Sequence, residues 1–82
     1  MRWTQHPHQP GALIAHGTRT SYTLARHHDG HRWIITETPH PGRLPLLDIP
    51  LDGRVFAELA AAKSWAERLD NRAGPDAQMG HA

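Results

Sequence analysis

Histidine is the residue type with the clearest capacity for chemistry, because the 82-residue chain holds eight of them. Five lie beside predicted turns: His6, His8, His27, His28 and His31. Imidazoles bind zinc or nickel, and Asp29 could add an oxygen ligand. Neighbouring residues of a strand point to opposite faces, so the pair able to share an ion is His28 with His31. Two ligands do not complete a site, and we therefore predict solvated histidines and no metal site.

Catalysis has less support in the sequence. A nucleophile needs a base and an orienting group, whereas the only serines are Ser21 and Ser64, and Ser64 falls on the polar side of a predicted helix. Glu37 is the only acid well inside a predicted strand, so no converging pair of carboxylates is expected. No phosphate-binding loop, nucleotide fingerprint or metalloprotease motif is present. The sequence predicts no enzyme, no catalytic residues and no cofactor.

Nucleic-acid binding is a second possibility, through one face of a predicted sheet. A two-stranded ribbon fits the DNA major groove. The candidate binding face consists of Arg19, Thr23, His27, Arg32, Ile34 and Thr36. Nine basic residues against eight acidic ones leave a net charge of +1, so few phosphates could be neutralised and any binding should be weak. The same residues equally fit an ordinary solvated sheet face.

The element that would position these side chains is a β-hairpin over residues 20–38. Two runs rich in Thr, Tyr, Ile and Trp flank Asp29-Gly30, a pair typical of a two-residue type I′ turn. That turn would place Arg26 opposite Trp33, where the guanidinium could stack on the indole. It also predicts the pairs Leu24 with Ile35, Tyr22 with Glu37 and His28 with His31. Tyr22, Leu24, Trp33 and Ile35 then share the core face, and the candidate binding face lies opposite.

The rest of the chain predicts an α+β fold. Residues 12–16 form a short strand that makes the sheet three-stranded and antiparallel, and residues 46–51 are a possible fourth, edge strand. A proline-rich loop covers residues 39–45, where Pro excludes a central strand or a helix. Apolar spacing predicts one helix from about residue 55 to 69 that packs across the sheet, although Phe56 could instead end a strand. The predicted divisions are a loose lead at 1–11, one domain at 12–73 and a disordered tail at 74–82.

The predicted core is small. Its members are Leu13, Tyr22, Leu24, Trp33, Ile35, Leu47, Phe56, Leu59, Ala62, Ala66 and Leu69, with Trp65 at its edge. A domain of this size buries little surface and often depends on a partner or on a second copy of itself. The Ile34 face, residues 44–51 and Trp65 offer apolar area for such a contact. The competing interpretation is that the proline-rich loop folds over and buries that area.

Composition gives a weaker indication of where the chain works. No cysteine is present, which fits a reducing compartment. No apolar run is long enough to span a bilayer, and the polar first residues are unlike a signal peptide. We expect a cytoplasmic protein with no membrane contact.

Three short motifs carry a resemblance to known groups: Tyr22-Thr-Leu, then Asp29-Gly30-x-x-Trp33, then Phe56-x-x-Leu59-x-x-Ala62-Lys63-x-Trp65-Ala66-Glu67. Together they resemble small uncharacterised β-β-β-α proteins of actinobacteria and their phages. More loosely, they are similar to the arm-binding N-terminal domains of tyrosine integrases. The second resemblance implies a sheet that enters the DNA major groove with a helix behind it. Glu58 departs from it, because a Ser or Thr cap is usual before the leucine.

These observations favour a non-catalytic binding module. We expect an adaptor or modulator that contacts a protein, or a second copy in a homodimer, through its sheet face and proline-rich loop. The alternative is a DNA-binding accessory factor that uses the open sheet face. Ile34, Leu46 and Leu51 would carry the energy in the first case, and Arg19 and Arg32 in the second.

Overall fold

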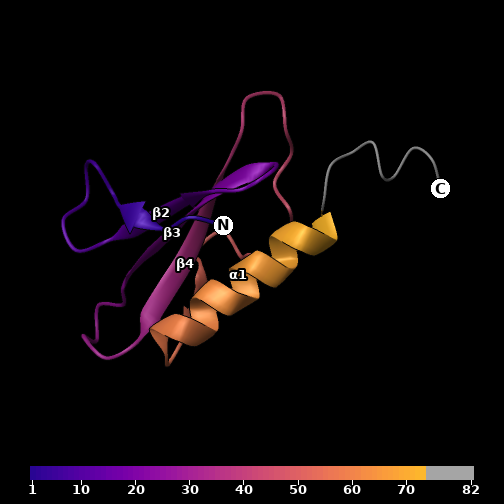
Figure 1. The fold of residues 1–82 in the computed structure, drawn as a ribbon. Helices are drawn as coiled ribbons and strands as arrows, with labels where there is room; N and C mark the ends of the chain where they lie inside the picture. The colour runs from indigo at the N-terminus through magenta and orange to yellow at the C-terminus, as the bar shows by residue number, and fades with distance from the viewer. Residues whose placement is uncertain (74–82) are drawn as a thin grey trace.

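A computed structural model describes residues 1–73, which form a five-stranded antiparallel sheet with one helix on one face (Figure 1). The predicted tail at 74–82 lies outside the described residues. The elements in chain order are β1 (Thr4–Gln5), β2 (Leu13–His16), β3 (Thr20–Arg26), β4 (Trp33–Pro39), β5 (Arg54–Phe56) and α1 (Leu59–Ala73). Strand order in the sheet follows chain order, so each strand pairs with its sequence neighbours. The α+β class and the single C-terminal helix are thus confirmed for this part of the chain.

The predicted count of three or four strands is wrong. Strand β1 lies inside the segment predicted to be a loose lead, and its residues pair as Thr4 with Ile14 and Gln5 with Leu13. Two residues are too few to establish an alternating pattern, so the neighbouring prolines and glycine dominated the prediction. Trp3, next to β1, packs against the core.

The segment between β4 and α1 also differs from the prediction. The possible edge strand at 46–51 is absent, and β5 instead pairs with the first half of β4, from Trp33 with Phe56 to Ile35 with Arg54. The helix begins at Leu59 and not near residue 55. Of the two alternatives for Phe56, the structure has the strand end. Arg72 in the last turn of α1 is well placed for the negative end of the helix dipole.

The register of the β3–β4 hairpin is confirmed, but its predicted turn is wrong. Arg26 pairs with Trp33, Leu24 with Ile35 and Tyr22 with Glu37. A type I′ turn needs positive φ at both central residues, whereas Gly30 is the only residue from 27 to 32 with positive φ, at 79°. The ladder ends at Arg26 and Trp33, so the predicted pair of His28 with His31 does not form. The faces keep their predicted identity because the register is unchanged.

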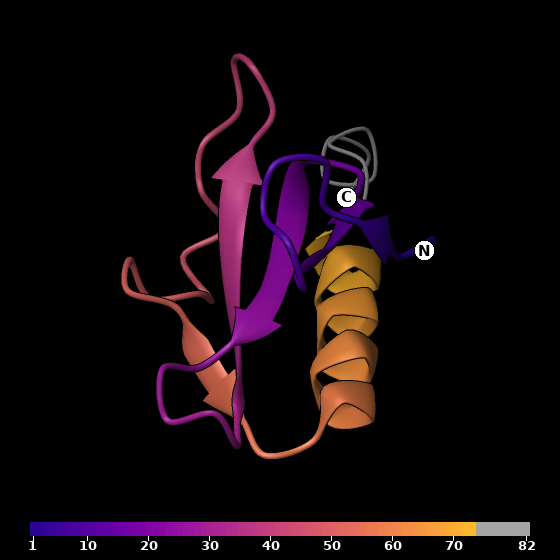
Figure 2. The same ribbon diagram turned by 90° about the vertical axis from the view of Figure 1, so that its left-hand side faces the viewer.

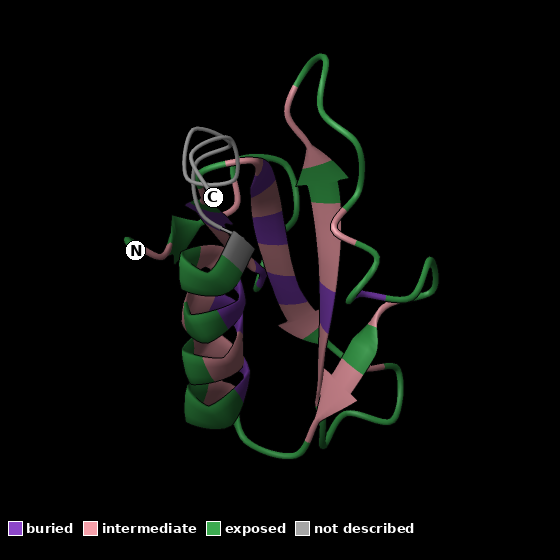
Figure 3. Cartoon of the chain, turned by 90° about the vertical axis from the view of Figure 1, so that its right-hand side faces the viewer, coloured by how far each residue is buried: buried purple, intermediate pink, exposed green. Residues whose placement is uncertain are grey.

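Helix α1 packs on the sheet face that carries the hydrophobic core. Figure 3 shows the buried turns of α1 directed toward the buried positions of β3. Tyr22, Leu24 and Ile35 are fully buried there, and burying an aliphatic side chain of this size contributes roughly 1.5–3 kcal/mol. The prediction of Leu47 as a core residue is wrong, because Leu47 is exposed and Ile49 is buried in its place. Trp33, Phe56, Leu59, Trp65 and Leu13 are partly buried around this core.

The long connection from β4 to β5, residues 40–53, projects past the end of the sheet in both ribbon views (Figure 1, Figure 2). It is longer than the proline-rich loop predicted at 39–45, because Pro39 belongs to β4 and no strand forms at 46–51. From here on, the proline-rich loop means residues 40–53, which contain Pro41, Pro45 and Pro50. Within residues 1–73, α1 lacks the length and apolar character needed to cross a membrane.

Candidate protein-interaction site

The open face of the sheet, opposite α1, brings together half of the predicted binding face. Thr23 pairs with Thr36, and the next pair along the same face is Ala25 with Ile34. All four side chains are partly exposed. Their hydroxyl and methyl groups make an uncharged surface. This part of the open face therefore lacks the positive charge that phosphate binding requires.

The basic members of the predicted face lie at opposite ends of the hairpin. Arg19 belongs to the turn before β3, whereas His27 and Arg32 follow its other end. A seven-residue strand separates them, which corresponds to about 23 Å at the usual rise per residue. The structure does not bring the two arginines together.

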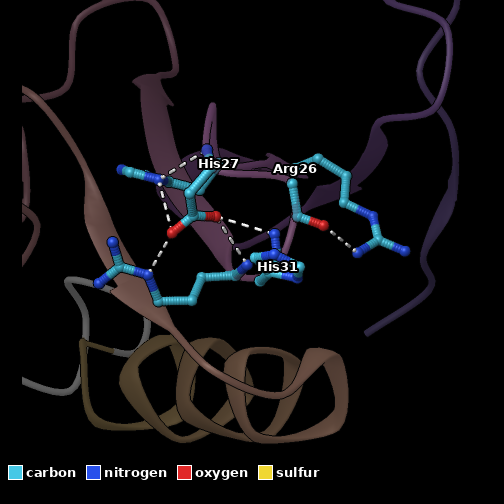
Figure 4. Close-up of polar contacts among 6 residues, drawn as sticks. Arg26, His27 and His31 are labelled. Atoms are coloured by element: carbon cyan, nitrogen blue, oxygen red, sulfur yellow. Dashed lines mark hydrogen bonds and ion pairs between the residues drawn. The ribbon is translucent and has the colours of Figure 1, made fainter.

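Asp29 organises the turn that carries His27 and Arg32. Figure 4 labels His27 and His31 in this turn and marks the hydrogen bonds and ion pairs as dashed lines. Its Oδ1 accepts hydrogen bonds from the backbone N–H groups of His31 (2.8 Å) and Arg32 (3.1 Å). Its Oδ2 accepts a hydrogen bond from Nε of Arg32 at 2.6 Å and lies 3.3 Å from Nδ1 of His27. The Arg32 guanidinium is therefore already held by an acid within its own loop.

Arg26 is fixed on the other side of this turn. Its guanidinium stacks over the Trp33 ring at 4.8 Å, which is the predicted contact, and it donates a hydrogen bond to the Gly30 carbonyl (3.1 Å). The turn itself is closed by the Gly30 N–H bonded to the His27 carbonyl (2.9 Å). These contacts make residues 26–32 a structural loop in which most polar groups have partners.

This geometry predicts an acid-sensitive turn. Hydrogen bonds from the His31 backbone, then from the Arg32 side chain and backbone, hold the pKa of Asp29 well below its usual range. A lowered carboxyl pKa contributes stability that is present above the unfolded value of about 4 and is lost as the pH falls below it. In Asp29→Ala, the amides of His31 and Arg32 should exchange roughly tenfold faster with solvent and without this acid dependence. Hydrogen exchange by NMR measures both effects, and unchanged exchange would contradict this role.

The histidines are distributed in a way that sequence reasoning missed. In the described residues, no group of three or more His, Asp or Glu side chains is arranged to bind a metal ion. The ring centroids of His27 and His28 lie 3.9 Å apart, with the ring planes tilted by 38°. At the other end of the sheet, Ser21 Oγ lies 2.8 Å from Nδ1 of His16 and 3.3 Å from Nε2 of His40. The strand register alone could have revealed the first of these pairs, because His16 is opposite Ser21.

The largest exposed apolar side chains of the described region, apart from Met1, gather on the proline-rich loop. Leu44, Leu47 and Leu51 have relative exposures of 76%, 87% and 103%. Leu47 also has a φ of 72°, a left-handed conformation that costs a branched side chain roughly 1–2 kcal/mol. Strained residues of this kind often mark binding segments. Leu47 thus combines a strained backbone with a side chain that stays in water.

Trp65 was predicted to add to the exposed apolar surface, but its side chain packs elsewhere. Its ring packs against Phe56, with centroids 5.4 Å apart, and the Arg54 guanidinium lies over it at 4.8 Å. Trp65 is accordingly half-buried.

A groove of about 420 Å³ lies between the proline-rich loop and the second half of β4. This volume is within the range of roughly 300–1,000 Å³ typical of ligand pockets. The lining residues are Thr36, Glu37, Pro39, Pro45, Leu47, Ile49, Pro50 and Leu51. Thr36 belongs to the predicted binding face, so the groove joins that face to the loop. We call it the loop groove.

Glu37 fixes the loop over this groove. Its Oε1 accepts a hydrogen bond from the backbone N–H of Leu46 at 3.0 Å. Its Oε2 is buried and has no hydrogen-bond partner. A buried acceptor without a donor typically costs 1–3 kcal/mol. Glu37 is also the one charged residue among those that line the loop groove.

Comparison of the chain with protein-family models, with curated proteins and with solved structures finds no match. The resemblances to actinobacterial and phage proteins and to integrase arm-binding domains therefore stay predictions.

Proposed function

We propose that this protein is a non-catalytic binding module whose proline-rich loop and adjoining sheet face contact another protein. The observation that carries the proposal is the set of three exposed leucines on the proline-rich loop, Leu44, Leu47 and Leu51, of which the last two line the loop groove. Exposed apolar side chains gathered on one segment are typical of partner surfaces. Burying a leucine that is exposed in the free protein contributes roughly 1.5–3 kcal/mol.

The DNA-binding alternative has less support from the geometry. The Arg32 guanidinium is bound to Asp29, and Arg19 lies at the far end of β3. Few positive charges could therefore reach neighbouring phosphates from the open face. The remaining support for this alternative is the resemblance to integrase arm-binding domains.

Site-specific photo-crosslinking tests the proposal. A benzophenone amino acid replaces Leu47 in the full chain, in cells that naturally make it. A matched probe replaces Ala61, which is exposed on α1. We expect discrete protein adducts from position 47 and few from position 61. An adduct of twice the chain's own mass would identify the partner as a second copy. Equal yields at both positions, or none at position 47, would contradict the proposal.

A further inference from the structure

The outer edge of β4 is only half covered by β5. The ladder between these strands ends at Ile35 paired with Arg54, whereas β4 continues to Pro39. No described strand pairs with the outer edge from Thr36 onward. An uncovered strand edge presents backbone N–H and C=O groups that another extended chain can pair with.

Two hydrogen bonds at the ends of the β3–β4 hairpin indicate which backbone groups point outward. The His27 N–H donates to the Arg32 carbonyl (2.8 Å), and the His40 N–H donates to the Arg19 carbonyl (3.0 Å). Hydrogen-bonded pairs alternate with non-bonded pairs along an antiparallel ladder. Counting in steps of two from either bond gives the same hydrogen-bonded pairs, so the backbone groups of Thr36 and Thr38 point toward β3. Glu37 then directs its N–H and C=O away from β3 and along the loop groove.

Pro39 limits the length of this free edge. Its backbone has no N–H, so it can only accept a hydrogen bond. The edge therefore offers one donor, from Glu37, and two acceptors, from Glu37 and Pro39. That set suits a short extended segment and excludes a long added strand.

The loop groove also selects the charge of its occupant. Among its lining residues, the charged one is Glu37, and the Glu37 Oε2 atom is buried without a donor. In an added strand, the residue directly opposite Glu37 would place its side chain on the same face as the Glu37 carboxylate. A lysine or arginine at that position would compensate the negative charge of Glu37. The flanking residues would meet Leu47, Leu51 and the loop prolines, which favours apolar side chains there.

We infer that the loop groove binds a short extended peptide segment of a partner protein, which pairs with β4 at Glu37 and carries one basic residue among apolar ones. This inference rests on the proposed function and names the chemistry of the partner. It assigns three roles: the Glu37 backbone holds the strand, the Glu37 carboxylate holds the basic side chain, and the loop leucines cover the apolar residues.

Selection of random nine-residue peptides displayed on phage, with the 82-residue chain as bait, tests the inference. We expect the enriched peptides to carry a lysine or arginine between apolar residues. The best peptide, synthesised with capped ends, should bind Glu37→Gln about tenfold more weakly than the unmodified chain. The matched variant Glu58→Gln, at an exposed acid next to α1, should bind normally. N-methylation of the peptide's basic residue removes its backbone N–H and should weaken binding by a similar factor.

The outcomes separate this inference from the proposed function. Strand pairing would be refuted if peptide affinity falls for Leu47→Ser/Leu51→Ser but is unchanged by Glu37→Gln and by N-methylation of the peptide. That result would still support a loop that binds protein. Enrichment of acidic peptides, or binding that is indifferent to all of these changes, would overturn the inference. The photo-crosslinking result then decides the proposed function by itself. Circular dichroism of each variant verifies that the fold is retained. We expect the double leucine variant to fold because both leucines are exposed.

Discussion

Replacing Gly53 by alanine should destabilise the protein by about 3 kcal/mol, the sum of a left-handed backbone and an overpacked contact. Gly53 has a φ of 96°, and a Cβ there would lie 2.6 Å from Cγ1 and 2.7 Å from Cδ1 of Ile34. The Gly53 N–H also bonds to the Pro50 carbonyl at 2.8 Å, which fixes the end of the proline-rich loop. Urea denaturation followed by circular dichroism measures the loss in free energy of unfolding.

Gly30→Ala is the matched control for this prediction. Gly30 has a φ of 79°, but a Cβ there would meet no atom within 4 Å. Gly30→Ala should therefore lower the free energy of unfolding only through backbone strain, by about 1 kcal/mol. If the two variants are destabilised equally, the Ile34 side chain can move aside at no energetic cost. That result would contradict the tight packing of Gly53 on β4.

Removing the Asp70 carboxylate should cost a similar amount, about 3 kcal/mol. Asp70 joins the end of α1 to the sheet: its Oδ1 accepts hydrogen bonds from the Thr18 N–H (2.9 Å) and the Tyr22 hydroxyl (3.1 Å). Its Oδ2 accepts a third from Thr18 Oγ1 at 3.1 Å. Asp70→Ala leaves the hydroxyl of the buried Tyr22 without an acceptor, whereas Asp70→Asn retains Oδ1. Thermal denaturation should separate the two variants, and equal midpoints would contradict this role.

The same contact sets the behaviour of the protein in alkali. Burial, and then the neighbouring Asp70 carboxylate, raise the pKa of Tyr22 above its ordinary value near 10. Below that pH both the folded and the unfolded protein hold the phenolic proton, and the stabilisation is complete. Above it the unfolded state loses the proton first, so stability should fall as the pH rises. Tyr22→Phe should remove this decline, and an equal decline in that variant would contradict the assignment.

The parts of the fold that the sequence predicts are those with a repeated pattern. Alternation in residues 20–26 and 33–39 predicts the register, because a slip of one residue would expose Leu24 and Ile35. The apolar period of α1 places Ala62, Ala66 and Leu69 on the buried side, where the structure has them. Such patterns arise because buried positions of a strand or a helix recur at a fixed spacing and are occupied by apolar residues.

The elements that the sequence did not predict are short and depend on contacts far along the chain. Strand β1 has two residues and β5 has three, too few for any period to appear. The turn at Asp29 departs from type I′ because Asp29 accepts hydrogen bonds from His31 and Arg32 instead of taking a positive φ. Long-range pairing therefore decided the number of strands.

The candidate site was predicted in part. Its loop and sheet face were expected to offer apolar area, but the loop groove depends on which apolar residue of the loop is buried. Leu47 and Ile49 are two residues apart, and Ile49 is the buried one in a loop that has a left-handed backbone at Leu47 and a hydrogen bond from the Leu46 N–H to Glu37. No local pattern specifies either feature.

The central claim is that the loop leucines, and not the basic residues of the open face, carry partner binding. Photo-crosslinking from a benzophenone amino acid at position 44 tests it most directly, with two double variants compared in the same cells. In Leu47→Ser/Leu51→Ser, we predict a loss of protein adducts of about tenfold or more. In Thr23→Glu/Arg32→Ala, which opposes phosphate binding on the open face, the adduct yield should stay within about twofold. Retained adducts in the first variant together with lost adducts in the second would contradict the account.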